Sequence, residues 1–196
     1  MCAYAKGVVG KSMKNKFFLI GIPSCGKSTL GRRVADILQI PFFDTDTMVS
    51  NKMGKMGLAD VFRSSFEVLY VEEQKKVIAQ FSEIDTPALI ATGAEVGLMP
   101  YCVRHMDNIG YTIHIKRDPE MILEHLRNDG ESGLTLRNEA DGTEIVMREE
   151  AVRLYAKKLS EYREAALLML DNNGSEDEGV EKLSFLIEKL IQIQCG

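Results

Sequence analysis

The feature that most constrains the fold is a glycine-containing loop near the N-terminus, Gly21-Ile22-Pro23-Ser24-Cys25-Gly26-Lys27-Ser28. The apolar run Phe17-Phe18-Leu19-Ile20 precedes this loop, and apolar residues at helical spacing follow it from Lys27 to Leu38. A short, fully apolar run is typical of a buried strand in a parallel sheet. A strand, a G-x-x-x-x-G-K-S loop and a helix, in that order, predict a phosphate-binding loop (P-loop). Backbone N–H groups and the helix N-terminus then surround phosphate oxygens.

The polar side chains of this loop have predicted roles. Lys27 is expected to bring a positive charge to the β- and γ-phosphates of a nucleotide, and Ser28 to offer its hydroxyl to Mg²⁺. A fortuitous turn with solvated side chains is the alternative, and the flanking strand and helix argue against it. Two interpretations of Cys25 stay open, an oxidisable thiol beside a helix N-terminus and a small side chain that fills space. The residues predicted to contact the nucleotide here are Pro23, Ser24, Cys25, Gly26, Lys27, Ser28 and Thr29.

Size, charge and cysteine usage narrow the class of protein. The length of 196 residues suits one α/β domain, and the net charge of −5 does not suggest a basic surface for nucleic acid. No apolar run approaches the length of a membrane span. The four cysteines show no paired spacing, which indicates a reducing compartment. We therefore expect a cytoplasmic protein, and we also expect a monomer. Residues 1–15 are interpreted as a flexible basic extension without the apolar core of a signal peptide, and residues 16–196 as a single domain.

Along the rest of the chain, short apolar runs alternate with helical patterns. Further strands are predicted at 41–43, 88–91, 111–115 and 166–170, and helices at 47–53, 58–63, 65–83, 148–159 and 180–193. Asp118-Pro119 is expected to begin another helix, with Asp as the cap and Pro in the first helical position. This alternation predicts a mainly parallel sheet covered by helices on both faces.

Two aspartates, Asp44 and Asp46, follow the second predicted strand. Ligands of open α/β sheets gather at the carboxyl ends of the strands. If the segment is extended, both side chains point roughly the same way. One carboxylate is then expected to serve the Mg²⁺ shell, and the other to accept a hydrogen bond or proton from a hydroxyl group. A turn in which Asp44 caps a helix is the alternative.

Two polar segments lie between the later elements. The segment at 128–141 is rich in glycine, and a loop of this length within a compact domain is usually functional or disordered. We expect a lid at about residues 128–142. Residues 172–179 are interpreted as an acidic surface turn.

These motifs resemble those of the shikimate kinase family over about residues 17–171. The resemblance implies a three-layer α/β/α P-loop kinase fold, with a five-stranded parallel sheet of the nucleoside-monophosphate-kinase type and a lid over the nucleotide. The matching segments are Gly26-Lys27-Ser28-Thr29-Leu30-Gly31-Arg32, Phe43-Asp44-Thr45-Asp46, Leu58-Ala59-Asp60-Val61-Phe62, Ala91-Thr92-Gly93, and Tyr162 with Ala165 and Ala166.

The resemblance also implies an activity, the ATP-dependent transfer of the γ-phosphoryl group to a hydroxyl of a small metabolite, with shikimate as the first candidate. It implies that Ser28 and Asp44 serve Mg²⁺, and that Lys27 and Asp46 are catalytic, with Asp46 contacting the acceptor hydroxyl. Beyond these, the implied contacts are Gly93 and Lys158 for the acceptor, and His125 and Arg127 for the nucleotide.

Three positions depart from the family pattern, because Val71, Ser132 and Lys158 stand where the family has arginines. A hydrogen bond to a charged group is worth about 1.5–3 kcal/mol, so these changes weaken the expected affinity for an anionic acceptor. Glu95 also replaces a family glycine. Three functions therefore stay open: a kinase of shikimate or a less anionic acceptor, a kinase of another class of acceptor, and a nucleotide-binding protein without transferase activity.

Overall fold

The computed structural model describes residues 14–52, 67–128, 135–137 and 144–195. A five-stranded parallel sheet forms its centre, in the order β2-β3-β1-β4-β7. The strands are β1 (Lys16–Ile20), β2 (Phe42–Asp44), β3 (Ala88–Ala91), β4 (Gly110–Lys116) and β7 (Leu168–Asp171). The predicted number of strands and their parallel arrangement are confirmed.

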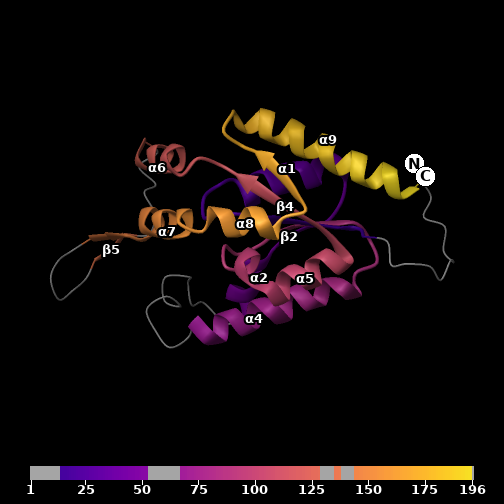
Figure 1. The fold of residues 1–196 in the computed structure, drawn as a ribbon, viewed down its shortest axis with the longest axis horizontal. Coiled ribbons are helices and arrows are strands. Elements are labelled where there is room, and N and C mark those ends of the chain that lie inside the picture. Colours follow the sequence, from indigo (N-terminus) through magenta and orange to yellow (C-terminus); the bar gives the residue numbers. More distant parts are fainter. Residues whose placement is uncertain (1–13, 53–66, 129–134, 138–143, 196) are drawn as a thin grey trace.

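Helices cover both faces of this sheet, which gives the predicted three layers (Figure 1). The helices α1 (Lys27–Leu38) and α9 (Glu176–Cys195) pack against each other on one face. The helices α4 (Glu67–Gln80), α5 (Pro100–Ile109) and α8 (Leu159–Ala165) lie on the other. The short elements α2 (Thr45–Lys52), η1 (Phe81–Glu83) and η2 (Val96–Leu98) connect strands to helices.

The central strand β1 explains the stability of this arrangement. It pairs with β3 on one side and β4 on the other, and all five of its side chains are buried. Strands covered on both faces read as continuous apolar runs, which is why Phe17 to Ile20 alone sufficed to predict β1. No helix in the described ranges is long and apolar enough to cross a membrane.

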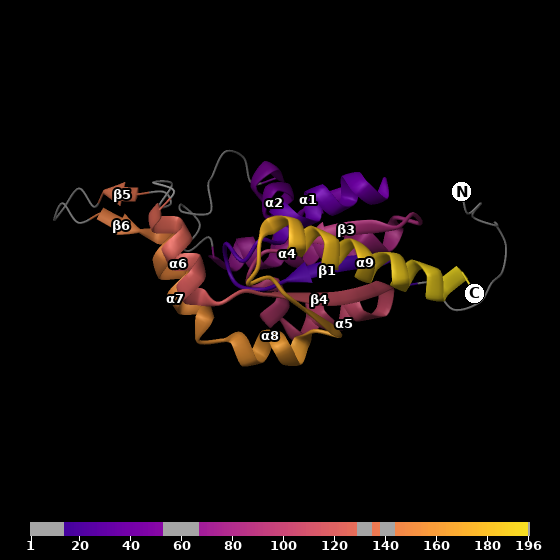
Figure 2. The same ribbon diagram turned by 90° about the horizontal axis from the view of Figure 1, so that it is seen from above.

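A second unit lies at one end of the molecule in both ribbon views (Figures 1 and 2). It contains α6 (Pro119–Asn128), α7 (Met147–Ala156) and an antiparallel pair, β5 (Thr135–Arg137) with β6 (Glu144–Val146). The prediction of an unstructured polar loop for 128–141 was therefore wrong at β5, since a strand contains three of its residues. The side chain of Asp118 accepts a hydrogen bond from the Glu120 N–H at 3.0 Å, which confirms the predicted cap of α6.

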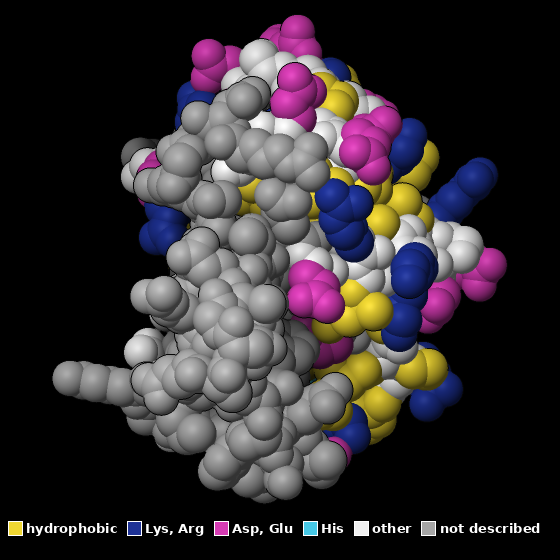
Figure 3. Space-filling view, turned by 90° about the vertical axis from the view of Figure 1, so that its left-hand side faces the viewer, with side chains coloured by type: hydrophobic (Ala, Val, Ile, Leu, Met, Phe, Trp, Pro, Cys, Tyr) yellow, Lys and Arg dark blue, Asp and Glu magenta, His cyan; other side chains and the backbone are white. Residues whose placement is uncertain are grey.

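On the face toward this end of the molecule, lysine and arginine side chains of the described part alternate with acidic and apolar ones (Figure 3). Two sequence predictions fall outside the described residues, the helix at 58–63 and the extension over most of 1–15. Among the described residues, Cys25 and Cys102 are free and buried.

Candidate active site

The P-loop connects the end of β1 to the start of α1, and its backbone takes conformations that favour glycine. Gly21 and Gly26 have φ angles of 145° and 103°. A Cβ atom at Gly21 would lie 2.7 Å from the Ile115 carbonyl oxygen, and one at Gly26 would lie 2.7 Å from Nδ2 of Asn172. Both glycines of the motif are therefore required by the backbone and by close packing.

Lys27 lies folded back over this loop. Its Nζ donates hydrogen bonds to the carbonyl oxygens of Gly21 and Ile22, each at 2.9 Å. The side chain is only 9% exposed, so the ammonium group is held at the mouth of the loop rather than in bulk water. A cation held between the loop and the sheet suits the binding of phosphate oxygens.

Ser28 and Asp44 come together at the carboxyl edge of the sheet. The Ser28 hydroxyl donates a hydrogen bond of 2.6 Å to Oδ2 of Asp44. The other oxygen, Oδ1, accepts the Thr47 N–H at 3.1 Å, so Asp44 also caps α2. The interpretation of Asp44 as a helix cap is therefore confirmed, and its role toward Mg²⁺ stays a prediction. A hydroxyl beside a carboxylate is the donor set that suits Mg²⁺ bound to nucleotide phosphates.

Asp46 lies in the first turn of α2. The segment from Asp44 to Asp46 is not extended, so the premise that both side chains share one direction was wrong: β2 ends at Asp44 and helix begins at Thr45. Oδ1 of Asp46 accepts hydrogen bonds from the Tyr70 hydroxyl and from Nε2 of Gln74, the latter at 2.8 Å. Burial raises the pKa of the Asp46 carboxyl, and the bond from Tyr70 opposes that shift.

Gly93 approaches Asp46 from the end of β3. Its N–H donates to Oγ1 of Thr45 at 2.9 Å, and a Cβ at this position would lie 2.5 Å from Oδ1 of Asp46. The structure therefore brings Gly93 and Asp46 together, as both were predicted for the acceptor side. Lys158 lies exposed at the start of α8, and its predicted role stays a prediction.

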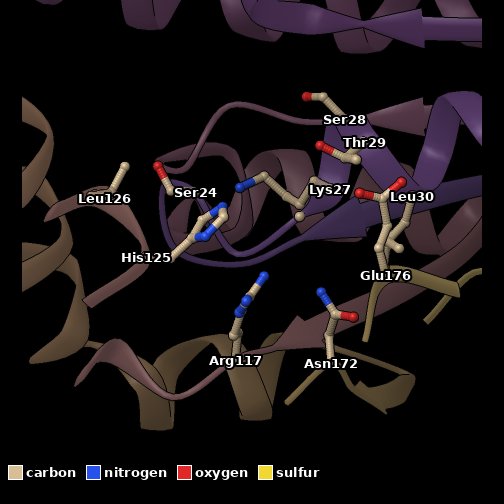
Figure 4. Close-up of a pocket in the computed structure, with 11 residues that line it drawn as sticks. Ser24, Lys27, Ser28, Thr29, Leu30, Arg117, His125, Leu126, Asn172 and Glu176 are labelled. Atoms are coloured by element: carbon tan, nitrogen blue, oxygen red, sulfur yellow. The ribbon is translucent and has the colours of Figure 1, made fainter. Parts of the chain in front are cut away.

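A cavity of about 300 Å³ opens beside the P-loop (Figure 4). His125 of α6 lines it, and its predicted contact with the nucleotide stays a prediction. Pro23 and Cys25 are absent from its lining, and the Cys25 side chain is fully buried, which fits the interpretation of Cys25 as a space-filling residue. The side chain of Arg127 lies outside the described part. The lining residues are Ser24, Gly26, Lys27, Ser28, Thr29, Leu30, Arg117, His125, Leu126, Asn172 and Glu176.

Two of these residues were missed from the sequence. Arg117 follows β4, its side chain lies opposite Ser28 and Thr29, and its Nε is buried without a hydrogen-bond partner. Asn172 follows β7 and is 4% exposed, so its assignment to a surface turn was wrong. Its Nδ2 donates to the Cys25 carbonyl oxygen at 2.9 Å and ties the P-loop to the segment that follows β7. Both follow strand ends at the same sheet edge, which is the signal that identifies them.

The fold and this site define a P-loop kinase of small molecules. The family model described as "Shikimate kinase" matches residues 23–188, so the chain belongs to the shikimate kinase family. It is an ATP-dependent, shikimate-kinase-like phosphotransferase.

Individual relatives agree with this membership. A shikimate kinase of Clostridium botulinum (strain Alaska E43 / Type E3) is 29% identical over 175 residues, which cover 89% of this chain and 98% of the relative. One from Synechococcus sp. is 36% identical over 112 residues, or 57% of this chain and 58% of the relative. The solved structure of the Acinetobacter baumannii shikimate kinase in complex with shikimate has a TM-score of 0.70 at 20% identity, covering 91% of this chain and 96% of that one.

Proposed function

We propose that this protein transfers the γ-phosphoryl group of ATP to a hydroxyl of a small hydroxylated metabolite, with shikimate as the first candidate. The observation that carries the proposal is the grouping of Lys27, Ser28 and Asp44 at one sheet edge, with Asp46 two residues beyond Asp44. Lys27 would contact the β- and γ-phosphates on the loop, and Arg117 and His125 would line the remainder of the nucleotide site.

Mg²⁺ fits the residues present, since Ser28 and Asp44 offer a hydroxyl and a carboxylate in direct contact. When bound, the cation would neutralise charge that develops on the phosphate oxygens. Ser28 and Asp44 are the residues proposed to hold it. Lys27 supplies the protein's own positive charge to the same oxygens, and such electrostatic positioning is the main source of catalysis in phosphoryl transfer.

Asp46 would accept a hydrogen bond from the acceptor hydroxyl and orient it toward the phosphorus atom. The hydrogen bonds from Tyr70 and Gln74 favour this role, because they hold the carboxylate in place and oppose the rise in its pKa that burial causes. The neighbouring Gly93 leaves room for Asp46 at the carboxyl end of β3. We further expect a cytoplasmic monomer, which size-exclusion chromatography and cell fractionation would test.

The acceptor side departs most from the family pattern. Val71 occupies a family arginine position on α4 and is half-buried beside Tyr70. A hydrocarbon side chain offers no charge to an acceptor carboxylate, so an acceptor other than shikimate is the second candidate. A gluconokinase of Sinorhizobium meliloti shares the fold, with a TM-score of 0.58 at 13% identity.

A coupled ADP-release assay tests the proposal. The purified protein is mixed with ATP, Mg²⁺ and shikimate, and in parallel with a panel of sugar acids, polyols and nucleosides, while ATP binding is measured separately. Turnover of shikimate supports the first candidate, and turnover of another compound replaces it. Tight ATP binding without turnover of any compound would contradict transferase activity and favour a regulatory or binding protein.

A further inference from the structure

The two carboxylate oxygens of Asp46 have different surroundings. Oδ1 accepts the Tyr70 hydroxyl and Nε2 of Gln74, and the same Nε2 donates to the Tyr70 oxygen at 2.8 Å. Three side chains therefore form a closed triangle of hydrogen bonds. A carboxylate oxygen has about two lone-pair sites, so both sites of Oδ1 are used by the protein itself.

The triangle is fixed in place by packing. Tyr70 and Gln74 are four residues apart on α4, which puts them on one face of the helix, and they are 2% and 0% exposed. Gly93 closes the remaining side, since a Cβ there would lie 2.5 Å from Oδ1 and 2.7 Å from Nε2 of Gln74. Oδ1 therefore faces Tyr70, Gln74 and Gly93.

Oδ2, the other oxygen of Asp46, has different hydrogen bonding. Among the described residues, none donates a hydrogen bond to Oδ2. Of the two oxygens, Oδ2 is therefore the one that the described residues leave for a ligand.

We propose that Tyr70 and Gln74 are positioning residues that hold the Asp46 carboxylate in one orientation, with Oδ2 directed at the acceptor hydroxyl. This inference rests on the proposed function, in which Asp46 orients the acceptor. A carboxylate that is free to rotate offers its oxygens to a hydroxyl in many positions, whereas Asp46 held in this way offers Oδ2 in one position. One hydroxyl is then directed at the phosphorus, which is the geometry that in-line transfer requires.

Removal of the Tyr70 hydroxyl tests the inference. Tyr70→Phe keeps the ring but frees a lone pair on Oδ1, so the carboxylate loses its fixed orientation. With ATP, Mg²⁺ and shikimate, we expect kcat to fall roughly ten- to a hundredfold, the equivalent of one hydrogen bond to a charged group. The KM for ATP should stay within about twofold, because Tyr70 contacts no P-loop residue among its hydrogen bonds. Gln74→Met should lower kcat in the same way.

Tyr162→Phe is the matched control. It also removes the hydroxyl of a fully buried tyrosine, but that hydroxyl donates to the Ala94 carbonyl oxygen at 2.7 Å and not to Asp46. A kcat of folded Tyr70→Phe within twofold of wild type would overturn the inference. So would an equal loss in Tyr162→Phe, because the effect would then be a general consequence of losing a buried hydroxyl.

Crystal structures of wild type and Tyr70→Phe separate this inference from the proposed function. If the wild type phosphorylates no compound, the proposed function fails, and the structures still decide whether Tyr70 holds Asp46. A rotated or disordered Asp46 side chain in Tyr70→Phe supports the inference. An unchanged Asp46, with Oδ1 still against Gln74 and Gly93, overturns it.

Discussion

The Ser28 hydroxyl donates a 2.6 Å hydrogen bond to Oδ2 of Asp44, which joins the first turn of α1 to the end of β2. Ser28 comes from the P-loop motif, and Asp44 from a strand at the other side of β3 in the sheet order. The contact therefore depends on the folded sheet. It brings together a hydroxyl and a carboxylate, the two groups proposed to serve Mg²⁺.

Asp44→Asn should weaken the apparent affinity for Mg²⁺. The amide keeps the size of the side chain but removes its charge, which is worth about 1.5–3 kcal/mol in a hydrogen bond to a charged group. We expect the Mg²⁺ concentration for half-maximal turnover to rise roughly tenfold or more. Asp36→Asn, an exposed carboxylate of α1, is the control. An identical Mg²⁺ titration for wild type and Asp44→Asn would contradict the assignment.

Asn172→Ala should loosen the P-loop. The variant leaves the Cys25 carbonyl oxygen without its buried donor, and one such hydrogen bond contributes about 1 kcal/mol. We expect ATP to bind roughly fivefold more weakly, as measured by isothermal titration calorimetry. The neighbouring Asn173→Ala removes an exposed amide that accepts the Asp118 N–H instead, so its affinity for ATP should stay near wild type. Equal affinities for all three proteins would show that Asn172 does not shape the loop.

Gly93→Ala should impair the acceptor side. The added methyl group would lie 2.5 Å from Oδ1 of Asp46, so the carboxylate or the backbone has to move. We expect kcat to fall by roughly tenfold or more with little change in ATP affinity. Gly174→Ala is the control, since its methyl group would meet only the exposed, flexible side chain of Glu178. Wild-type kcat in a folded Gly93→Ala would mean that Asp46 tolerates displacement.

His114 should make stability depend on pH. It is 2% exposed, stacks on Tyr162, and both ring nitrogens lack hydrogen-bond partners. Burial, with smaller effects of Lys27 and Lys116, lowers its pKa to about 4. The unfolded chain, with a histidine pKa of about 6.5, therefore binds more protons between pH 4 and 6.5. The stabilisation is complete above about pH 6.5 and is lost as the pH falls toward 4, by up to about 3 kcal/mol.

Urea denaturation at several pH values measures this effect. The free energy of unfolding of His114→Phe should fall less steeply than that of wild type between pH 6.5 and 4.5. His105→Gln changes a histidine at the surface, which bonds to Ser82, and should keep the wild-type slope. If His114→Phe also keeps that slope, another group controls the acid sensitivity.

The fold followed from the sequence because its signals are local. A buried parallel strand is apolar throughout, and the loop motif follows directly after one, so β1 and α1 needed no long-range information. Asp44 was found for a related reason, since it ends a strand at the carboxyl edge of the sheet, whereas Gly93 came from the resemblance to the shikimate kinase family.

The remaining site residues depend on contacts between distant segments. Asn172 bonds to a carbonyl 147 positions earlier, and Gln74 reaches Asp46 across 28 positions. Asn172 and Gln74 are ordinary polar residues within their own segments, so the local sequence did not mark either of them as part of the site. The acidic residues 176–178 looked like a surface turn, but they form the first turn of α9, where negative charge stabilises the helix N-terminus.

The proposed role of Asp46, to orient the acceptor at a site whose nucleotide is bound by the P-loop, is tested most directly by Asp46→Asn. This variant keeps the shape of the side chain and removes its charge. With ATP, Mg²⁺ and the best acceptor from the panel, we expect kcat to fall roughly a hundredfold or more, together with wild-type affinity for ATP. A wild-type kcat in Asp46→Asn would show that Asp46 does not orient the acceptor.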